Sequence, residues 1–265
     1  MGSPILDVKD LHKSFGALKV TDGVSLDLRA MECHALIGPN GAGKTTLINQ
    51  LFGTLRPSSG TIWFNGKDVT GDSVAARARQ GFGRTYQITS IIPGFSVLEN
   101  VALAAQAHDG TSLRFFRAAR LEDELNEKAM AALSMFGLEG RAGEKAANIS
   151  HGESRLLELA IAVVAEPKLL LLDEPMAGLG KTESEALTHT LSQLKSSVPM
   201  LLVEHDMDAV FALADRVSLL VEGRVVASGS PDAVRNDPNA RAAYLGEDDA
   251  LSGAPAVSKA AMEAP

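Results

Sequence analysis

Short runs of apolar residues recur along the chain, and turns or segments with helical spacing separate them. The runs at 35–37, 169–172 and 199–203 consist almost wholly of Leu, Ile, Val, Ala and Met. An uninterrupted apolar run of this length is typical of a strand that is buried on both faces of a parallel sheet. Because helical segments alternate with these runs, the pattern predicts an α/β fold.

Other strand patterns lie outside this alternation. Short strands are predicted at 5–8, 24–28 and 61–64, and the last leads into an Asn-Gly turn. We expect them to form an antiparallel layer beside the main sheet. The runs at 217–221 and 224–227 are joined by Glu-Gly and predict a hairpin.

Helical spacing appears in three places. The segment 47–51 predicts a helix after the first buried run, and Thr182 with Glu185 fits a capping box that opens a helix running to about Lys195. From 96 to 136 the pattern becomes helical. Its apolar residues fall on one helix face: Leu121, Leu125, Ala129, Ala132, Leu133 and Phe136.

These patterns divide the chain into four parts. We expect 1–87 to be the first part of a core that carries the antiparallel layer, and 88–158 to be a helical subdomain. The core should resume over 159–246. The end of the chain, 247–265, is acidic and then rich in Ala, Pro and Ser, which predicts a disordered tail.

Composition narrows the range of functions. The chain has 265 residues with 45% hydrophobic residues, enough for a sizeable core, and a net charge of -8. That charge argues against a general nucleic-acid binder, which needs clustered Lys and Arg. No apolar stretch approaches the ~20 residues that span a bilayer. Cys33 is the single cysteine, and the first residues do not resemble a secretory signal, so we expect a cytoplasmic location.

The clearest chemical motif follows the first buried run and fits G-x-x-x-x-G-K-[ST], a loop that wraps nucleotide phosphates. Lys44 is expected to meet the β- and γ-phosphates, and the Thr45 hydroxyl to bind Mg²⁺. The alternative, a glycine-rich turn with a chance lysine, does not explain the complete match between a strand and a helix. The motif and its last flanking residue are Gly38, Pro39, Asn40, Gly41, Ala42, Gly43, Lys44, Thr45 and Thr46.

Two carboxylates follow the second buried run directly. Asp173 and Glu174 would lie at the carboxyl end of a strand, where α/β sheets bind their ligands. Asp173 is expected to hold Mg²⁺, and Glu174 to orient and deprotonate the attacking water. The alternative is that both merely cap the turn between strand and loop.

A third motif, Ser150-His151-Gly152-Glu153, precedes an apolar helix. Ser150 and Glu153 match a capping box by themselves. A helix start with a free hydroxyl, and with Gly152 permitting close approach, can also receive a phosphate. We expect Ser150 to cap the helix in the absence of ATP and to turn toward the γ-phosphate in its presence.

In their order along the chain, these motifs resemble those of the ATP-binding subunits of ABC (ATP-binding cassette) transporters. The resemblance covers nearly all of 5–246. It implies a P-loop (RecA-like) nucleotide-binding core with an antiparallel β layer and an inserted α-helical subdomain. It further implies ATP and Mg²⁺ as ligands, and ATP hydrolysis coupled to transport. Two cassettes would close around two ATP molecules, each held between the phosphate loop of one subunit and Ser150, Gly152 and Glu153 of the other.

Three further residues acquire roles through this resemblance alone. Phe15 matches the aromatic residue that stacks on adenine, although it could be an ordinary core residue at a strand end. Gln87 matches a glutamine that touches Mg²⁺ and the attacking water and senses the membrane partner, although by itself it reads as an exposed loop amide. His205 matches a histidine that contacts the γ-phosphate, although a lone histidine is usually structural.

The chain departs from the common family pattern at His151, which replaces a glycine, at Gly180, which replaces an acidic or amide residue, and at Lys181, where proline is frequent. The segments 82–87, 177–179 and 243–247, together with the extended helical insert, are similar to one subgroup, which serves importers of branched-chain amino acids, urea and related amides. His151 favours the urea-type members slightly. The resemblance implies a second cassette (a related subunit or a second copy), two membrane-spanning permease subunits and, indirectly, a periplasmic solute-binding protein.

The subunit would then lie at the cytoplasmic face of the inner membrane. Two alternatives remain at this point. One is the ATPase of another ABC system, such as a lipid or lipopolysaccharide exporter. The other is a soluble ABC ATPase that works on DNA or ribosomes, but such proteins carry a long coiled-coil insertion or two cassettes in one chain. A purely regulatory ATP-binding module is disfavoured because Glu174 is present.

Overall fold

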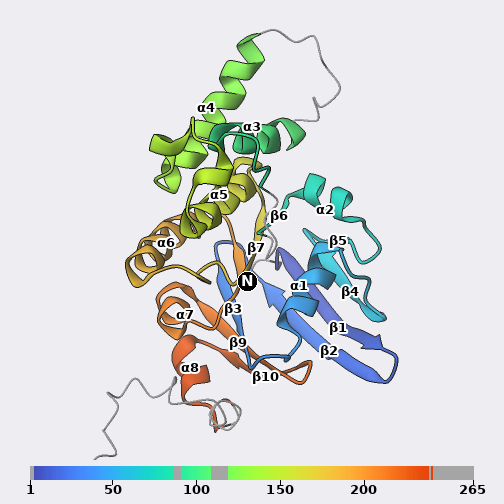
Figure 1. Cartoon of the computed structure of the whole chain (residues 1–265). Helices are drawn as coiled ribbons and strands as arrows, with labels where there is room; N and C mark the ends of the chain where they lie inside the picture. Colours follow the sequence, from blue (N-terminus) through green and yellow to red (C-terminus); the bar gives the residue numbers. More distant parts are fainter. Residues whose placement is uncertain (1–2, 86–90, 109–118, 239, 241–265) are drawn as a thin grey trace, which may run out of the picture.

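Two sheets form the framework of the molecule (Figure 1). The computed structural model describes residues 3–85, 91–108, 119–238 and 240. In this part of the chain, one sheet has six strands in the order β10-β9-β3-β8-β7-β6, and the other has four strands in the order β2-β1-β4-β5. The strands are β1 (Leu6–Phe15), β2 (Leu18–Leu28), β3 (Cys33–Ile37), β4 (Ser59–Phe64), β5 (Lys67–Asp68), β6 (Phe82–Arg84), β7 (Leu169–Asp173), β8 (Met200–Val203), β9 (Arg216–Val221) and β10 (Arg224–Gly229).

The six-stranded sheet is parallel except for the hairpin that joins β9 to β10. Every residue of β3, β7 and β8 is buried, as the continuous apolar runs predict. The helices that follow these strands cover the sheet. The α/β fold class with its antiparallel layer is therefore confirmed.

The four-stranded sheet is antiparallel and packs its inner face against α1 (Lys44–Phe52). Between this sheet and α1 lies a hydrophobic core. It includes Leu6, Leu28 and Phe64 of the strands and Leu47 and Leu51 of the helix. The early strands predicted from the sequence are confirmed, but β1 and β2 extend well beyond them. Their outer halves carry exposed polar residues and register shifts, which hide the period-two pattern.

Three helices form a lobe at one end of the molecule, at the top of Figure 1. They are α3 (Val97–His108), α4 (Ala119–Met135) and α5 (His151–Val164), and they pack on one another. Leu125, Ala129, Ala132, Leu133 and Phe136 are buried, which confirms the predicted apolar face. The side chain of Leu121 and the segments 86–90, 109–118 and 241–265 lie outside the described residues, so the predicted tail is not tested.

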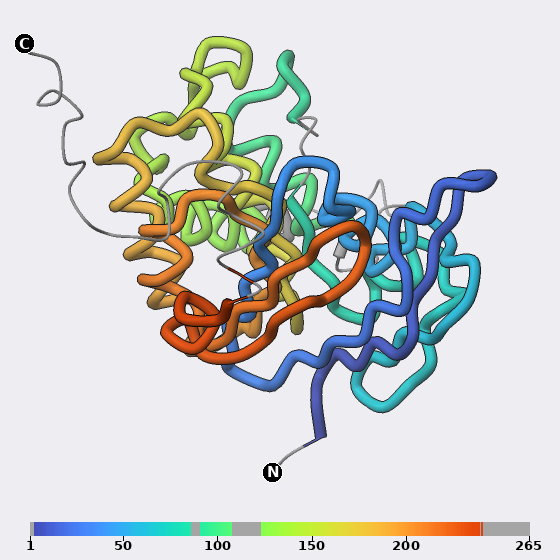
Figure 2. Tube along the Cα trace, turned by 90° about the horizontal axis from the view of Figure 1, so that it is seen from below, coloured from blue at the N-terminus to red at the C-terminus, as the bar shows by residue number. Residues whose placement is uncertain are grey.

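The remaining helices are α2 (Val74–Gln80), α6 (Lys181–Leu194), α7 (Met207–Leu213) and α8 (Pro231–Arg235), with short 3₁₀ turns η1 (Glu139–Arg141) and η2 (Ala146–Asn148). In Figure 2 the gold and green helical segments lie on one side of the molecule, and the blue and cyan strands of the four-stranded sheet lie on the other. None of the helices in the described ranges combines the length and the hydropathy that a membrane span requires.

The start of α6 differs from the prediction. The capping box assigned to Thr182 and Glu185 is wrong, because the helix already begins at Lys181 with Gly180 as its N-cap. Gly180 has no side chain that could cap. Instead the Glu183 carboxylate accepts a hydrogen bond from the Gly180 N–H at 2.9 Å. The Glu183 carboxylate alone thus accepts a hydrogen bond from a backbone N–H at the helix start, where the prediction required the Thr182 hydroxyl together with the Glu185 carboxylate.

A buried arginine holds the C-terminal end of α1 in place. Arg77 is 1% exposed and donates through Nη1 to the carbonyls of Gln50 (2.8 Å) and Leu51, and through Nη2 to those of Val69 (2.7 Å) and Thr70 (3.1 Å). Two of these carbonyls belong to the last turn of the helix, where intrahelical donors run out. Arg77 therefore fixes the helix that follows the phosphate loop to the segment directly after β5.

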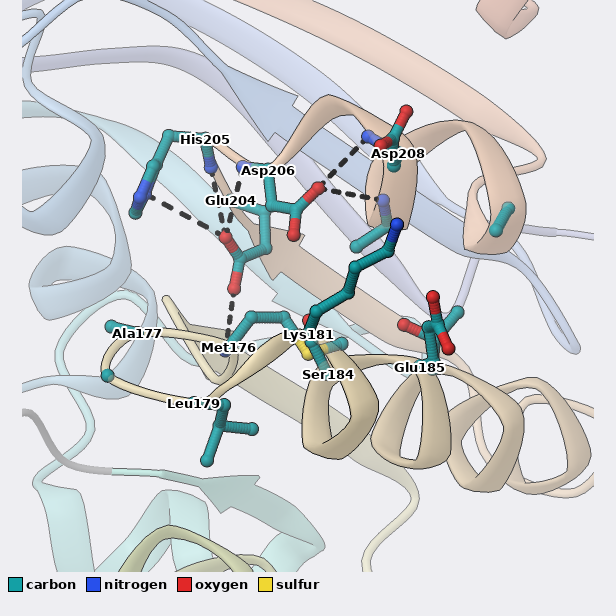
Figure 3. Close-up of a pocket in the computed structure, with 14 residues that line it drawn as sticks. Met176, Ala177, Leu179, Lys181, Ser184, Glu185, Glu204, His205, Asp206 and Asp208 are labelled. Atoms are coloured by element: carbon teal, nitrogen blue, oxygen red, sulfur yellow. Dashed lines mark hydrogen bonds and ion pairs between the residues drawn. The ribbon is translucent and has the colours of Figure 1, made fainter. Parts of the chain in front are cut away.

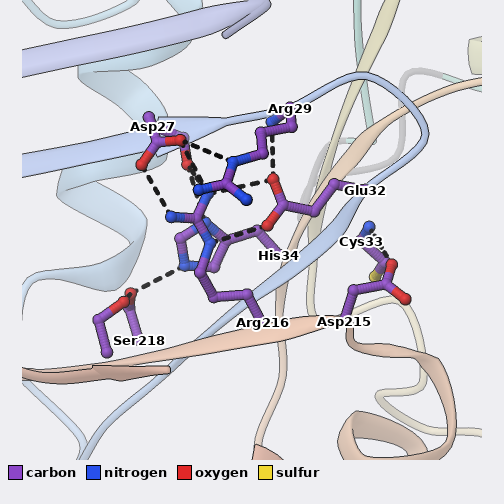
Figure 4. A network of polar contacts seen from close by, with 9 residues as sticks. Asp27, Arg29, Glu32, Cys33, His34, Asp215, Arg216 and Ser218 are labelled. Atoms are coloured by element: carbon purple, nitrogen blue, oxygen red, sulfur yellow. Dashed lines mark hydrogen bonds and ion pairs between the residues drawn. The ribbon is translucent and has the colours of Figure 1, made fainter. Parts of the chain in front are cut away.

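A polar network ties the two sheets together at the opposite edge from the loops that follow the strands (Figure 4). Arg216 on β9 bonds to the carboxylates of Asp27 (2.7 Å) and Glu32 (2.8 Å). His34 is 1% exposed, with Nδ1 3.1 Å from the Asp27 carbonyl and Nε2 2.8 Å from the Ser218 hydroxyl. Because a carbonyl only accepts, Nδ1 carries the proton of a neutral ring. Burial lowers the pKa of His34 to about 4.

Candidate functional site

The parallel strands bring the sequence motifs to one edge of the sheet. In the strand register, Leu36 pairs with Val203, and Val203 also pairs with Asp173. Hence the phosphate loop after β3, the carboxylates at the end of β7 and His205 after β8 all leave the sheet at the same edge. Segments that are far apart in the sequence thus form one site, as expected for the carboxyl ends of parallel strands.

The phosphate loop can follow its path only with glycine at two positions. At Gly38 a Cβ atom would lie 2.1 Å from the carbonyl oxygen of Leu220, and at Gly43, where φ is +104°, it would lie 2.4 Å from that of Val20. Gly43 is also the N-cap of α1 and offers no side chain to the first N–H groups of the helix. Those donors therefore point toward the position that an oxyanion would occupy.

Lys44 lies inside the curl of this loop. It is 7% exposed, and its Nζ donates to the carbonyls of Gly38 (2.6 Å) and Pro39 (3.0 Å). The ammonium group is thereby placed among the backbone groups that would surround a phosphate. Thr45 is half-buried beside it in the first turn of α1, and Asn40 and Gly41 form the exposed rim.

Asp173 is the group whose surroundings most resemble an incomplete metal site. It is 0% exposed, and both carboxylate oxygens are buried with no hydrogen-bond partner among the residues that the structure describes. Arg84 Nη2 lies 3.6 Å from Oδ2, beyond hydrogen-bond range, and Arg84 also donates to Asn49 Oδ1 at 2.8 Å. Burial raises the pKa of Asp173, and Arg84 and Lys44 reduce that rise without reversing it.

These orphaned oxygens fit Mg²⁺, a hard cation that prefers oxygen ligands. The described residues contain no cluster of three or more His, Cys, Asp or Glu side chains suited to a metal. Mg²⁺ does not need one, because it usually binds one or two protein ligands together with waters and substrate phosphates. Asp173 and Thr45 are the residues that fit it here.

Glu174 has a strained backbone. Its φ is +51°, in the left-handed region that residues with a side chain seldom adopt. The N–H of Glu174 donates to the Val203 carbonyl at 2.8 Å, which holds the turn to the neighbouring strand. Such strain costs of order 1 kcal/mol and concentrates at functional sites. The side chain is half-buried, so it remains accessible to a water molecule.

His205 follows β8, and its side chain is 67% exposed. The residue before it, Glu204, is 1% exposed and accepts hydrogen bonds from the backbone N–H groups of Met176, His205 and Asp206 (Figure 3). Sequence reasoning gave Glu204 no role. The available signal was a carboxylate directly after a buried strand, the same signal that singles out Asp173.

A cavity of about 680 Å³ lies between two groups of residues, as Figure 3 shows. The loop from Met176 to Leu179 and the start of α6 form one side. Glu204, His205 and the first turn of α7 form the other. The cavity therefore borders the loop after Glu174 and the loop that carries His205.

Ser150 caps α5, as expected. Its Oγ accepts from the Glu153 N–H at 3.1 Å, and the Glu153 carboxylate accepts from the Ser150 N–H at 2.8 Å. Arg141 Nε also donates to Glu153 at 2.9 Å. Ser150 is exposed, so its hydroxyl can exchange this bond for one to a ligand. The phosphate-binding half of the expectation stays a prediction.

The two segments that contain the departures from the family pattern approach each other closely. His151 is so close to Gly178 that a Cβ atom there would lie 2.9 Å from His151 Cε1. A Cβ atom on Gly152 would lie 3.0 Å from an oxygen of Glu183, whose other oxygen caps Gly180. Within one chain, therefore, the Ser150 motif touches the loop that follows Glu174.

Two residues remain. Phe15 ends β1 and is 53% exposed, with Lys13 Nζ 5.1 Å from its ring centroid, so the alternative that it is a core residue is wrong. An exposed ring of this kind can stack on a flat ligand.

Gln87 lies outside the described residues. Thr85, shortly before it, leaves β6 at the same edge of the sheet and accepts from the Asp173 N–H at 3.4 Å.

Comparisons with known proteins agree with this arrangement. A family model described as "ABC transporter" matches residues 21–177, and one described as "Branched-chain amino acid ATP-binding cassette transporter" matches residues 224–250.

Individual relatives extend the likeness over the whole fold. The chain is 37% identical to the high-affinity branched-chain amino acid transport ATP-binding protein LivG of Salmonella typhimurium, covering 93% of this chain and 100% of the relative. It is 35% identical to BraF of Pseudomonas aeruginosa, which bears the same description, with the same coverage. Among solved structures it is similar to the ADP conformation of MJ1267, an ATP-binding cassette of an ABC transporter. That likeness has a TM-score of 0.82 at 31% identity and covers 93% and 100% of the two chains.

Proposed function

The chain belongs to the family of ABC transporter ATP-binding cassettes, and on that premise we propose that it hydrolyses ATP to drive the import of branched-chain amino acids. The single observation that carries the ATPase proposal is the meeting of the phosphate loop with the orphaned carboxylate of Asp173 at one edge of the sheet. The names of the relatives and the match at 224–250 favour branched-chain amino acids over urea or other amides.

ATP binds with its phosphates on the N–H groups of the loop 38–46 and on the start of α1. Lys44 Nζ exchanges its carbonyl partners for the β- and γ-phosphate oxygens, which attract an ammonium more strongly because they are charged. The adenine stacks on Phe15. Asp173 and Thr45 would hold Mg²⁺, which would neutralise part of the charge of the phosphates.

Hydrolysis is assigned to residues at the neighbouring strand ends. Glu174 accepts a proton from the attacking water, which adds to the γ-phosphorus as the bond to the β-phosphate oxygen breaks. His205 orients the γ-phosphate by a hydrogen bond. Gln87 is proposed to contact the water and Mg²⁺. The strained backbone at Glu174 supports this assignment, because such strain is retained where a side chain must be held in one direction.

A second cassette completes the site. Asn40 and Gly41 on the loop rim and Ser150 at the start of α5 are exposed, so an ATP on the loop leaves one side open to Ser150, Gly152 and Glu153 of another subunit. We propose that two cassettes, either two copies or this chain and a related subunit, close on two ATP molecules. Hydrolysis removes the bridging γ-phosphate and lets them open.

The helical lobe is the proposed link to the membrane. We assign 88–158 to a helical subdomain, and 1–87 with 159–246 to the nucleotide core. Ile92 and Phe95, which follow Gln87, are 37% and 41% exposed and offer an apolar contact to permease subunits. The subunit would then sit at the cytoplasmic face of the inner membrane, served indirectly by a periplasmic solute-binding protein, with no role in nucleic-acid binding.

Two variants test the ATPase proposal. Glu174→Gln should bind ATP as well as the wild type and lose nearly all turnover, because the amide cannot accept the proton. Lys44→Ala should weaken ATP binding itself. Wild-type turnover by Glu174→Gln, or unchanged affinity in Lys44→Ala, would refute the assignment. Co-purification with a lipid exporter's membrane subunits would redirect the transport proposal while leaving the ATPase intact.

A further inference from the structure

Glu204 connects two loops of the proposed site without itself reaching the solvent. We propose that Glu204 is a positioning residue for ATP hydrolysis, which clasps the loop after Glu174 to the loop that carries His205. This inference rests on the proposed function, because the two loops are those assigned to the attacking water and the γ-phosphate. It assigns no contact with the nucleotide, since the Glu204 side chain is 0% exposed.

The geometry of the clasp requires two acceptor oxygens. Oε1 accepts from the N–H of Met176 at 2.8 Å, and Oε2 accepts from the N–H groups of His205 at 3.0 Å and Asp206 at 3.4 Å. Figure 3 shows the carboxylate between the two loops. Glutamine has the same shape but only one acceptor oxygen and an NH₂ donor. The glutamine side chain can therefore accept a hydrogen bond from one loop only. At the other loop its NH₂ group would face a backbone N–H, and two donors cannot bond to each other.

The contact with Met176 reaches Glu174 through a short turn. Ala177 N–H donates to the carbonyl of Glu174 at 3.1 Å, and Glu174 N–H donates to Val203 at 2.8 Å. Met176 lies inside this turn, so a movement of its backbone rotates Glu174. On the other side, Glu204 directly precedes His205 and bonds to its N–H. One carboxylate thus sets the relation between the proposed base and the proposed phosphate ligand.

Packing holds these loops only in part. Met176 is buried in the core, but Ala177 and Leu179 are half-buried and border the cavity of about 680 Å³, and His205 and Asp206 border it from across. A loop beside a cavity has fewer van der Waals contacts to fix it. Burying a carboxylate is unfavourable unless its oxygens are well paired. The three N–H donors supply that pairing and oppose the rise in pKa that burial causes at Glu204.

The experiment compares Glu204→Gln with the wild-type full chain in steady-state hydrolysis and nucleotide binding. The expected result is a fall in kcat of about tenfold, equal to about 1.4 kcal/mol, with the Kd for ATP within about twofold. Glu185→Gln is the matched control: Glu185 borders the same cavity but is exposed, and its variant should keep wild-type kcat. A kcat within twofold of wild type in Glu204→Gln, or parallel losses in kcat and ATP affinity, would overturn the positioning role.

A second measurement needs no variant to fold. In the wild-type chain the amide hydrogens of Met176 and His205 should exchange with solvent at least about tenfold more slowly than that of Ala177, which bonds only within its own turn. Rapid exchange at Met176 would show that the clasp is absent. If the wild-type chain fails to hydrolyse ATP, the proposed function fails; if it hydrolyses ATP and Glu204→Gln matches it, only this inference fails.

Discussion

Replacing Asp173 with asparagine should make the nucleotide-free protein more stable and the enzyme inactive. The two oxygens of Asp173 are fully buried, and within the described part of the chain neither has a hydrogen-bond partner. Its pKa is raised by burial although Arg84 and Lys44 attract the charged form, so the surroundings as a whole disfavour the carboxylate. Asparagine keeps the shape of the side chain and removes the charge. The Asp173 carboxylate thus lowers the stability of the nucleotide-free chain, although it is needed once substrate is bound.

The size of the gain follows from two opposing terms. An unsatisfied buried polar group costs roughly 1–3 kcal/mol, and more when it is charged; the asparagine amide also stays unsatisfied, so the variant recovers only the additional cost of the charge. The loss of the Arg84 interaction offsets part of this. That loss is small because the two groups are 3.6 Å apart and Arg84 keeps its bond to Asn49 at 2.8 Å. We expect a net gain of about 1 kcal/mol, which raises Tm by roughly 2–4 °C in a chain of this size.

Thermal unfolding without nucleotide, together with hydrolysis at saturating ATP and Mg²⁺, measures both effects. Asp173→Asn should unfold at a higher temperature than wild type and hydrolyse ATP at least about 100-fold more slowly. Added Mg²⁺ and nucleotide should stabilise the wild-type chain more than the variant. A lower Tm in the variant would show that Arg84 and Asp173 form a stabilising pair, and wild-type hydrolysis would refute the metal assignment.

Three further outcomes are expected. Burial lowers the pKa of His34 from 6.5 to about 4, so the unfolded chain binds the proton more readily than the folded chain. The free energy of unfolding should therefore be highest above pH 6.5 and fall by about 2 kcal/mol by pH 5. In His34→Gln this fall should be less steep. A pH profile of unfolding that is identical in both chains would contradict this. Arg77→Leu removes the guanidinium donor from four carbonyls, of which those of Gln50 and Val69 keep a backbone N–H donor. The variant should lose about 2 kcal/mol of stability in denaturant unfolding; a change below about 1 kcal/mol would mean that water replaces the guanidinium. Gly178→Ala, at φ +81° and 2.9 Å from His151, should lower both Tm and kcat, and His151→Gly in the same chain should restore part of each. No restoration would place the whole effect in the backbone of Gly178.

The sequence predicts the parallel core well because its strands are buried on both faces. At 169–172 every position must be apolar, so the pattern does not depend on neighbours. The phosphate loop is predicted equally well, because its glycines are required by the backbone. At Gly38, for example, a side chain would collide with the carbonyl of Leu220. Ser150 and Glu153 form the box that their spacing predicts.

Other features depend on partners that lie far away in the sequence. The outer part of β1 pairs through register shifts, so its polar residues carry no simple alternation. The start of α6 depends on a glycine whose cap comes from Glu183, and the Thr182 pattern was misleading because hydroxyl spacing alone does not fix a helix start. The role of Glu204 appears only once β7 and β8 are side by side, because its donor at Met176 is 28 residues away.

In the proposed mechanism a site is complete only when Ser150 of a second cassette meets the ATP on the phosphate loop. Light scattering at saturating ATP can follow the association of the Glu174→Gln chain with a second cassette, with and without Ser150→Arg. We expect an ATP-dependent dimer for Glu174→Gln, and separate subunits that still bind ATP when Ser150→Arg is added. A dimer of equal stability in the Ser150→Arg chain, or no association of the Glu174→Gln chain with ATP, would contradict it.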